Sequence, residues 1–278
     1  MSTPASTPAS TPADARTVPG RSPAVTTPAR RMAALARAEL TLLGRSKGVL
    51  FTAVAVPLVL PFSLRASAED MDLEEHGLSV GSVLLPAAIG FSLLFAVYAA
   101  LVSVYAARRE ELVLKRLRTG ELRDPEILAG AALPSVAIGL VQSLLLVGAC
   151  AALLDVGAPS APHYAVVGML LGLVMWPLLA AATSSFSRSV ESAQVAAMPL
   201  LIVSMIGSGT VMPLEVMPDK LASVAELLPL TPVVELIRGG WTGNLSAPDA
   251  LRAIATAVAW IALGVFAVQR WFRWEPRR

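Results

Sequence analysis

The chain has 278 residues, of which 55% are hydrophobic and 15% charged, and it carries a net charge of +2. A soluble domain has about 25% charged residues, so this composition excludes an ordinary soluble fold. The small net charge gives no indication of nucleic-acid binding. The single cysteine, Cys150, allows neither an intrachain disulfide nor a thiolate metal cluster. The two histidines, His76 and His163, belong to no ligand motif, so we expect no metal site.

Residues 1–29 repeat Ser-Thr-Pro-Ala and contain few apolar side chains, which predicts a disordered tail. No apolar core follows a basic start, so this tail does not have the pattern of a secretory signal. Residues 30–47 alternate apolar and basic positions at helical spacing and lead directly into an apolar run. Such a segment predicts an amphipathic helix at the membrane interface. The alternative is a surface helix that packs on a soluble partner.

The remaining chain reads as an all-α polytopic membrane domain over residues 48–272, followed by a basic tail over 273–278. Apolar runs of about 20 residues have the length that a helix needs to cross a bilayer. About six such spans are predicted, and they cover residues 48–64, 80–107, 127–154, 164–186, 193–212 and 253–269. Between the last two, prolines break a less apolar stretch into two short helices, 219–228 and 233–238. Gly239 and Gly240 are expected to end the second of them.

The most conspicuous polar stretch is a charged island, residues 108–126, between the second and third spans. Its middle part favours a short helix that Gly120 can end. Asp124 then has the place of a helix cap, Pro125 of the first helical residue and Glu126 of an acidic residue near the positive helix end. The island is either the place where a soluble partner acts on the membrane domain, or a solvated loop that follows the positive-inside rule.

Lysine and arginine counts predict the orientation. With the N-terminus in the cytoplasm, sixteen basic residues fall inside, in residues 30–47, 108–123, 188 and 270–278, and four fall outside. The acidic stretch 68–75 also falls outside. This asymmetry predicts that both termini are cytoplasmic. We expect a multi-pass protein of the plasma (inner) membrane.

The predicted apolar cores contain no charged residue and no histidine, which argues against a proton-driven transporter. The polar groups at depth include Gln142, Thr183, Gln194 and Ser204, and helix–helix hydrogen bonding is favoured for them over substrate contact. The chain also lacks a phosphate-binding loop of the form G-x-x-x-x-G-K-[ST]. If ATP is used, another polypeptide must bind it.

The segment A-R-R-E-E-L-V-L-K-R-L-R-T-G-E-L-R-D-P-E-I-L-A-G resembles the charged stretch between the second and third spans of ABC-2 type exporter permeases. The family pattern R-E-x-G-T-L-E-R-L, followed by E-I-L-x-G-K, is matched at Arg109, Glu110, Leu114, Arg116, Leu117, Glu126, Ile127, Leu128 and Gly130. Leu112-Val113 stands where the family has Gly-Thr, and Lys115 where it has Glu. The resemblance implies that this stretch is the coupling helix that docks on an ATPase. The coupling residues it implies are Arg109, Glu110, Glu111, Leu114, Arg116 and Leu117.

A second segment, V-M-P-L-E-V-M-P-D-K-L-A-S-V-A-E-L-L-P-L-T-P-V-V-E-L-I-R-G-G-W-T-G, resembles the family's stretch before the last span. The resemblance implies short re-entrant helices on the outer side. The residues that carry this motif are Pro213, Met217, Pro218, Pro229, Thr231, Arg238 and Gly239.

The resemblance implies an export permease that is not itself an enzyme and has no cofactor of its own, with ATP and Mg on a partner ATPase. Two permeases, as a homodimer in membrane lipid, would work with two ATPases and move a hydrophobic or amphipathic small molecule, such as a drug, antibiotic or lipid-like compound. Two other functions fit the residues: a membrane accessory or scaffold protein that transports nothing, and a facilitator driven only by gradients.

Overall fold

The computed structural model describes residues 37, 41, 79–119, 123–154, 156–208, 217–272 and 274. In this part of the chain all regular structure is helical. Five helices are long and apolar enough to cross a membrane, and they correspond to the second to sixth predicted spans: Val80–Glu110, Asp124–Leu153, Pro162–Ser184, Val190–Gly207 and Ala247–Trp271. The chain is therefore a multi-pass, all-α membrane protein.

Several predicted segments lie outside the described residues. These are the tail 1–29, the first span 48–64, and all of 273–278 except Trp274. Of the amphipathic segment 30–47, Arg37 and Thr41 are described and helical, and the Thr41 hydroxyl donates a hydrogen bond of 2.7 Å to the Arg37 carbonyl.

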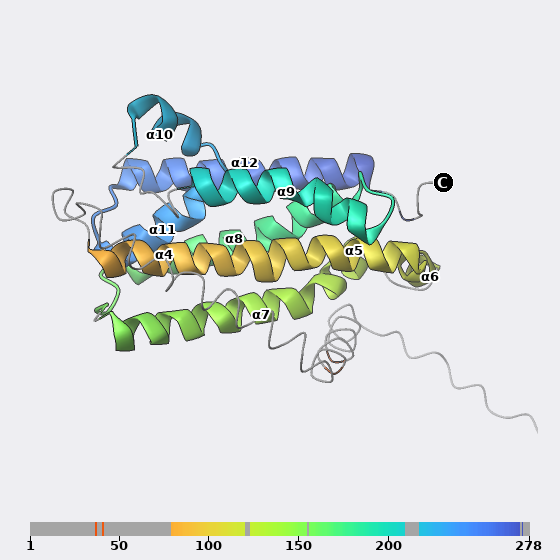
Figure 1. Ribbon diagram of the computed structural model, residues 1–278, viewed down its shortest axis with the longest axis horizontal. Coiled ribbons are helices and arrows are strands. Elements are labelled where there is room, and N and C mark those ends of the chain that lie inside the picture. The colour runs from red at the N-terminus through yellow and green to blue at the C-terminus, as the bar shows by residue number, and fades with distance from the viewer. Residues whose placement is uncertain are drawn as a thin grey trace, which may run out of the picture.

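The first described span is the most buried one. It consists of α4 (Val80–Ser92), the π-helical segment η2 (Leu93–Ala99) and α5 (Ala100–Glu110), which follow one another as a single rod along the bundle (Figure 1). In η2 the Leu93, Val97 and Tyr98 side chains are fully buried. Tyr98 lies 5.3 Å from Trp176, centroid to centroid, in the neighbouring span. This rod therefore supplies much of the core, while its end carries the start of the charged island.

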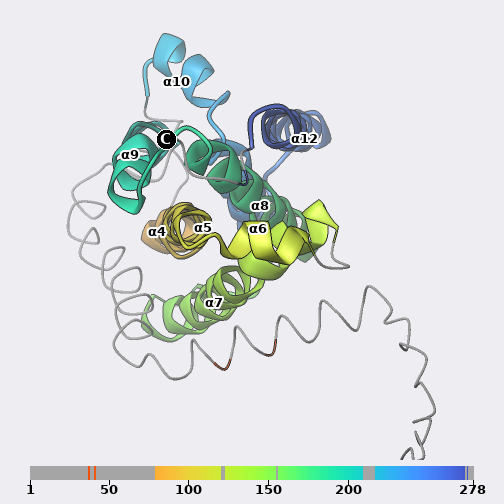
Figure 2. The same ribbon diagram turned by 90° about the vertical axis from the view of Figure 1, so that its right-hand side faces the viewer.

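The other spans pack around α8 (Pro162–Ser184). Seen along the bundle, α7 (Asp124–Leu153) and α12 (Ala247–Trp271) lie on either side of α8, and α9 (Val190–Gly207) lies on the far side of the α4–α5 rod from α7 (Figure 2). Gly168 and Gly172 of α8 let neighbouring helices approach closely, since an added Cβ would lie 2.8 Å from Leu236 and from Leu93, respectively. Small residues at such contacts are typical of helix packing in membranes.

Serine side chains cap the N-termini of three of the spans. Ser79 caps α4 and Ser189 caps α9, each by accepting from the backbone N–H three residues on, at 3.2 Å. Ser246 caps α12 in the same way, with Asp249 as donor at 3.3 Å. These caps satisfy backbone donors that a helix leaves unpaired in its first turn.

Polar side chains within the spans form hydrogen bonds across helices. This was predicted for four residues, and it is confirmed for three of them. Ser92 donates to Gln142 at 2.9 Å, Gln194 donates to Ser103 at 3.2 Å, and the Tyr98 and Thr183 hydroxyls lie 3.1 Å apart. The fourth, Ser204, is buried, and its hydroxyl has no hydrogen-bond partner among the described residues.

Two short helices precede the last span, α10 (Asp219–Ala225) and α11 (Thr231–Thr242). The prediction that Gly239 and Gly240 end the second helix is wrong. α11 continues through both glycines and ends at Thr242, and the residue that caps it, Gly243, has a left-handed φ of 73°. Gly240 is needed for packing instead, because a Cβ there would lie 2.6 Å from the backbone nitrogen of Ala165 in α8.

Candidate coupling site and outer network

The charged island folds at one end of the bundle. α5 ends at Glu110, and the short helix α6 (Val113–Arg118) follows after a tight turn at Leu112. α6 packs against α5 and α7, at the same end of the bundle as the C-terminal end of α12 (Figure 1). Lys220 and Arg252 belong to α10 and α12 near the opposite end. The two groups of basic residues that the sequence predicts on opposite sides are thus separated along the bundle.

Arg109 does not face solvent. Its side chain is 1% exposed. Its Nη1 donates to the carbonyl of Ser184 at 2.8 Å, and its Nη2 donates to the carbonyl and hydroxyl of Ser187 at 2.8 and 3.2 Å. Ser184 is the last residue of α8, where backbone carbonyls lack helical partners and a positive charge is stabilising. Arg109 is therefore placed as an internal cap of α8.

Glu110 is placed at the next helix. Its Oε1 accepts a hydrogen bond of 3.0 Å from the backbone N–H of Val190, the first residue of α9. A carboxylate at a helix N-terminus is favourable because unpaired N–H groups point towards it. Adjacent residues of α5 thus hold the end of α8 and the start of α9.

The other predicted coupling residues differ in exposure. Leu114 is fully buried, so its side chain is not presented to a partner. Leu117 is half-buried, whereas Glu111 and Arg116 are exposed. Leu112, which is not among the predicted coupling residues, is 38% exposed. Its φ of 58° is left-handed, a conformation that glycine adopts without steric cost and that is unfavourable for leucine.

The start of α7 differs by one residue from its prediction. Asp124 is not the cap but the first helical residue, and Pro125 is the second. The Glu126 carboxylate caps the helix instead, because it accepts a hydrogen bond of 2.9 Å from the backbone N–H of Arg123. The Asp124 carboxylate forms an ion pair with Arg118 at the end of α6, with 3.1 Å between Oδ1 and Nε.

A groove of about 820 Å³ opens beside this ion pair. α7, α8 and α12 supply apolar walls that include Leu128, Leu173 and Val265. Arg118, Asp124, Gln269 and Trp274 also line it, and the Arg118 guanidinium lies 5.1 Å from the centre of the Trp274 ring. The groove thus combines an apolar body with one polar end, and its size lies in the range of small-molecule sites.

Most residues of the predicted outer motif are packed inside the chain. Pro229, Thr231, Arg238 and Gly239 are buried, and the Thr231 hydroxyl donates to the Ala225 carbonyl. Met217 is half-buried, and Pro218 is the exposed cap of α10. Pro213 lies outside the described residues. The motif's described part therefore forms a folded corner between α10 and α11.

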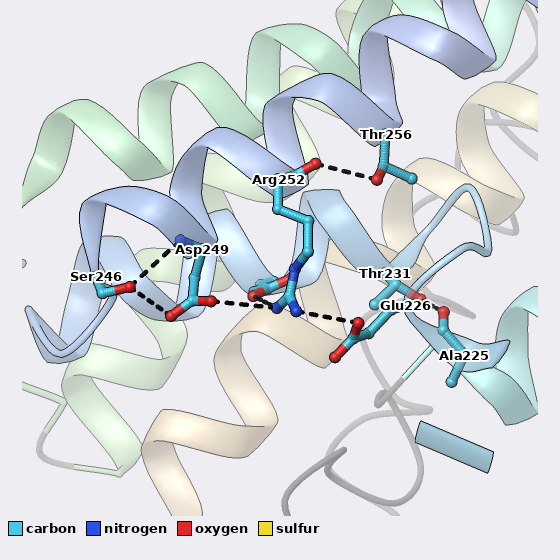
Figure 3. A network of polar contacts seen from close by, with 8 residues as sticks. Ala225, Glu226, Thr231, Ser246, Asp249, Arg252 and Thr256 are labelled. Atoms are coloured by element: carbon cyan, nitrogen blue, oxygen red, sulfur yellow. Dashed lines mark hydrogen bonds and ion pairs between the residues drawn. The ribbon is translucent and has the colours of Figure 1, made fainter. Parts of the chain in front are cut away.

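Arg252 ties this corner to the last span (Figure 3). It contacts Glu226 at 3.1 Å, Glu235 at 3.2 Å and Asp249 at 3.6 Å, and so joins the α10–α11 turn, α11 and the start of α12. The pKa of Glu235 is raised above its ordinary value because the side chain is partly buried, and the nearby Arg252 offsets only part of this increase. The Trp260 ring N–H adds a bond of 2.8 Å to the Leu227 carbonyl.

Sequence reasoning missed the partners of Arg109 and Glu110, namely Ser184, Ser187 and Val190. It also missed the network around Arg252. A pattern available in the sequence was the short polar turn 185–189 between two spans, which has to lie at one end of the bundle. Nothing in that pattern says which neighbouring element the turn contacts.

The comparison with protein families matches the ABC-2 type transporter family over residues 30–241. The comparison with curated proteins finds no significant match. The matched family is the membrane permease component of ABC transporters, which generally works with an ATPase partner. The match includes the charged island and all residues of the second motif, from Pro213 to Gly239. Because it covers most of the chain and agrees with the helical membrane fold, the protein belongs to the ABC-2 type transporter family.

Proposed function

We propose that this protein is the permease subunit of an ATP-driven exporter in the plasma membrane that moves a hydrophobic or amphipathic small molecule. The observation that carries the substrate class is the apolar groove between α7, α8 and α12, with its polar end at Arg118 and Asp124. An amphipathic molecule matches this division, with its apolar part between the spans and its polar part at the ion pair.

The ATPase partner docks on the exposed face of α6. This face presents Arg116 and the half-buried Leu117, and the turn just before α6 adds the exposed Glu111 and Leu112. Exposed apolar and charged side chains on a short helix and the turn before it suit a partner with a groove and charged rim. ATP and Mg bind on the partner, since the sequence has no phosphate-binding loop.

A second copy of the permease completes the pathway as a homodimer. α9 is the least buried of the five spans, and its exposed apolar residues recur at helical spacing: Val195, Met198, Ile202 and Ile206. In the membrane, either lipid tails or a second copy of the chain can cover such a face, and we propose the second copy.

The transport experiment uses inside-out membrane vesicles that contain the permease and its partner ATPase. A fluorescent organic cation, a fluorescent organic anion and a short-chain labelled phospholipid serve as probes. ATP-dependent uptake of at least one probe is expected in the wild type. Ala129→Trp fills the groove from an exposed position and should reduce uptake about tenfold, whereas Ala151→Trp, exposed on the same helix outside the groove, should not.

Uptake without ATP would favour the gradient-driven facilitator instead. An absence of uptake together with wild-type expression and no bound ATPase would favour the accessory protein. Equal uptake by both tryptophan variants would remove the groove from the substrate path.

The proposed orientation has both termini and α6 in the cytoplasm. Single cysteines at Arg188 and Asn244, both exposed, report on the two ends in a Cys150→Ser background. A membrane-impermeant thiol reagent added to intact cells should label Asn244→Cys and spare Arg188→Cys. The opposite labelling pattern would reverse the topology.

A further inference from the structure

The end of α5 is fixed to the turn between α8 and α9 by two adjacent residues. We infer that Arg109 and Glu110 form a rigid link that transmits displacement of α6 to the α8–α9 turn, residues 185–189. Arg109 is buried and Glu110 is exposed, but both side chains bond within the chain, and we assign them this role instead of contact with the ATPase. This inference rests on the proposed function, because the ATPase is the source of the displacement.

Arg109 fixes both the distance of the α8 side of the turn from α5 and its orientation relative to α5. Its two terminal nitrogens donate to two different carbonyls, those of Ser184 and Ser187, both at 2.8 Å. A guanidinium is planar, so two bonds from its fork also fix its orientation, which a lysine ammonium does not do. Because the side chain is 1% exposed, little water competes for these bonds.

Glu110 fixes the α9 side. Its carboxylate accepts from the N–H of Val190 at 3.0 Å, at the positive end of α9. The turn between the helices has its own short bonds, including Ser187 hydroxyl to Ser184 carbonyl at 2.7 Å. The residues on both sides of the turn are therefore held by neighbouring positions of one helix.

The connection from the pair to α6 is equally short. The Leu112 N–H donates to the Arg109 carbonyl at 3.1 Å, and the Arg116 N–H donates to the Leu112 carbonyl at 3.0 Å. Leu114 anchors α6 through a fully buried side chain. A force on the exposed face of α6 therefore acts directly on Arg109 and Glu110.

From the turn, α8 leads to the opposite end of the bundle. There the N–H of Ala161, just before α8, donates to the Gly240 carbonyl of α11 at 2.9 Å, and Gly240 lies against Ala165. A displacement of the inner end of α8 thus reaches α11 through one continuous helix. The link gives the charged island a physical route to the outer corner.

The experiment measures whether α6 and the α8–α9 turn move together. Spin labels are attached to Thr119→Cys and Arg188→Cys, both exposed, in a Cys150→Ser background. The distance between them is measured by pulsed electron paramagnetic resonance in the purified permease–ATPase complex, without nucleotide and with a non-hydrolysable ATP analogue. Glu110→Ala removes one half of the link. Glu191→Ala is the matched control, since it removes an exposed carboxylate from the same α9 N-terminus without a bond to α5.

The wild type and Glu191→Ala should give the same narrow distance in both nucleotide states. In Glu110→Ala the nucleotide should shift or broaden the distribution by about 2 Å or more, the size of ordinary helix movements at interfaces. Glu110→Gln keeps an acceptor oxygen and should behave more like the wild type than Glu110→Ala does. A nucleotide-dependent distance in the wild type, or an unchanged distance in Glu110→Ala, overturns the link. A wild-type permease that retains no ATPase overturns the proposed function itself.

Discussion

Arg109 and Arg252 hold opposite ends of the molecule by different means. Arg252 contacts three carboxylates, but its side chain is 47% exposed. Arg109 donates to neutral backbone carbonyls and is 1% exposed. Exposed ion pairs contribute about 0–1 kcal/mol, because water and salt screen them. Bonds from a buried charged group contribute about 1.5–3 kcal/mol each. Burial, and not the number of opposite charges, therefore decides which arginine matters more to the fold.

The largest effect is expected from Arg109→Leu. It leaves the carbonyls of Ser184 and Ser187 without their charged donor in a buried place, which should destabilise the protein by about 3 kcal/mol or more. Cys150, the single cysteine, is buried, so a thiol-reactive dye reports thermal unfolding in detergent. Arg116→Leu on the exposed face of α6 is the control and should leave the midpoint nearly unchanged. Equal midpoints for both variants would contradict the importance of burial.

A smaller loss is expected from Gly240→Val, which tests what holds the corner between α10 and α11. The new Cβ would lie 2.6 Å from the backbone nitrogen of Ala165, so α11 has to move away from α8. Overpacking of this kind costs about 1–3 kcal/mol. Gly148→Val provides the comparison, because an added Cβ at that exposed helical position meets open space. The same dye assay should show a lowered midpoint for the first variant alone.

Arg252→Gln should cost less than either of these changes, about 1 kcal/mol or less at neutral pH, because its ion pairs are exposed. The loss should also depend on pH. Burial raises the pKa of Glu235 in the folded protein, so its contribution favours the fold at low pH and is lost as pH rises through that raised value. Arg252 opposes this effect only while Glu235 is ionised.

The difference between wild type and Arg252→Gln should therefore be larger at pH 7.5 than at pH 5. Unfolding midpoints across this range measure it. In a Glu235→Gln background the pH dependence of the difference should shrink, leaving the contributions of Glu226 and Asp249. A difference that grows towards acid pH would contradict the assigned direction.

The smallest effect is a gain in stability from Leu112→Gly. The left-handed conformation costs an L-residue about 1–2 kcal/mol, and glycine avoids this cost while losing more chain entropy on folding. We expect a net gain of a few tenths of a kcal/mol to about 1 kcal/mol. Leu112→Ala keeps the unfavourable φ and should give no gain. A loss of stability with glycine would show that the leucine side chain contributes more than its backbone costs.

The sequence by itself determined the membrane class, the positions of the described spans and the family. Apolar runs of span length and the absence of charge within them follow directly from the solvent properties of the bilayer, so they can be read one segment at a time. The pairing of Gln142, Thr183 and Gln194 across helices was predictable for the same reason, although their partners were not. The family resemblance identified the charged island and the α10–α11 corner by their residue patterns.

Only the tertiary structure decided what the individual residues of those segments contact. Arg109 and Arg116 belong to the same charged stretch and look alike in sequence, yet one is buried and the other exposed. The difference arises because the turn between α8 and α9, some 75 residues further along the chain, places unpaired carbonyls beside Arg109. Gly240 likewise lies within a helix instead of ending it, and its lack of a side chain lets α11 approach Ala165 of α8 closely. Helical periodicity describes one segment at a time, whereas these roles depend on which other segment lies beside it.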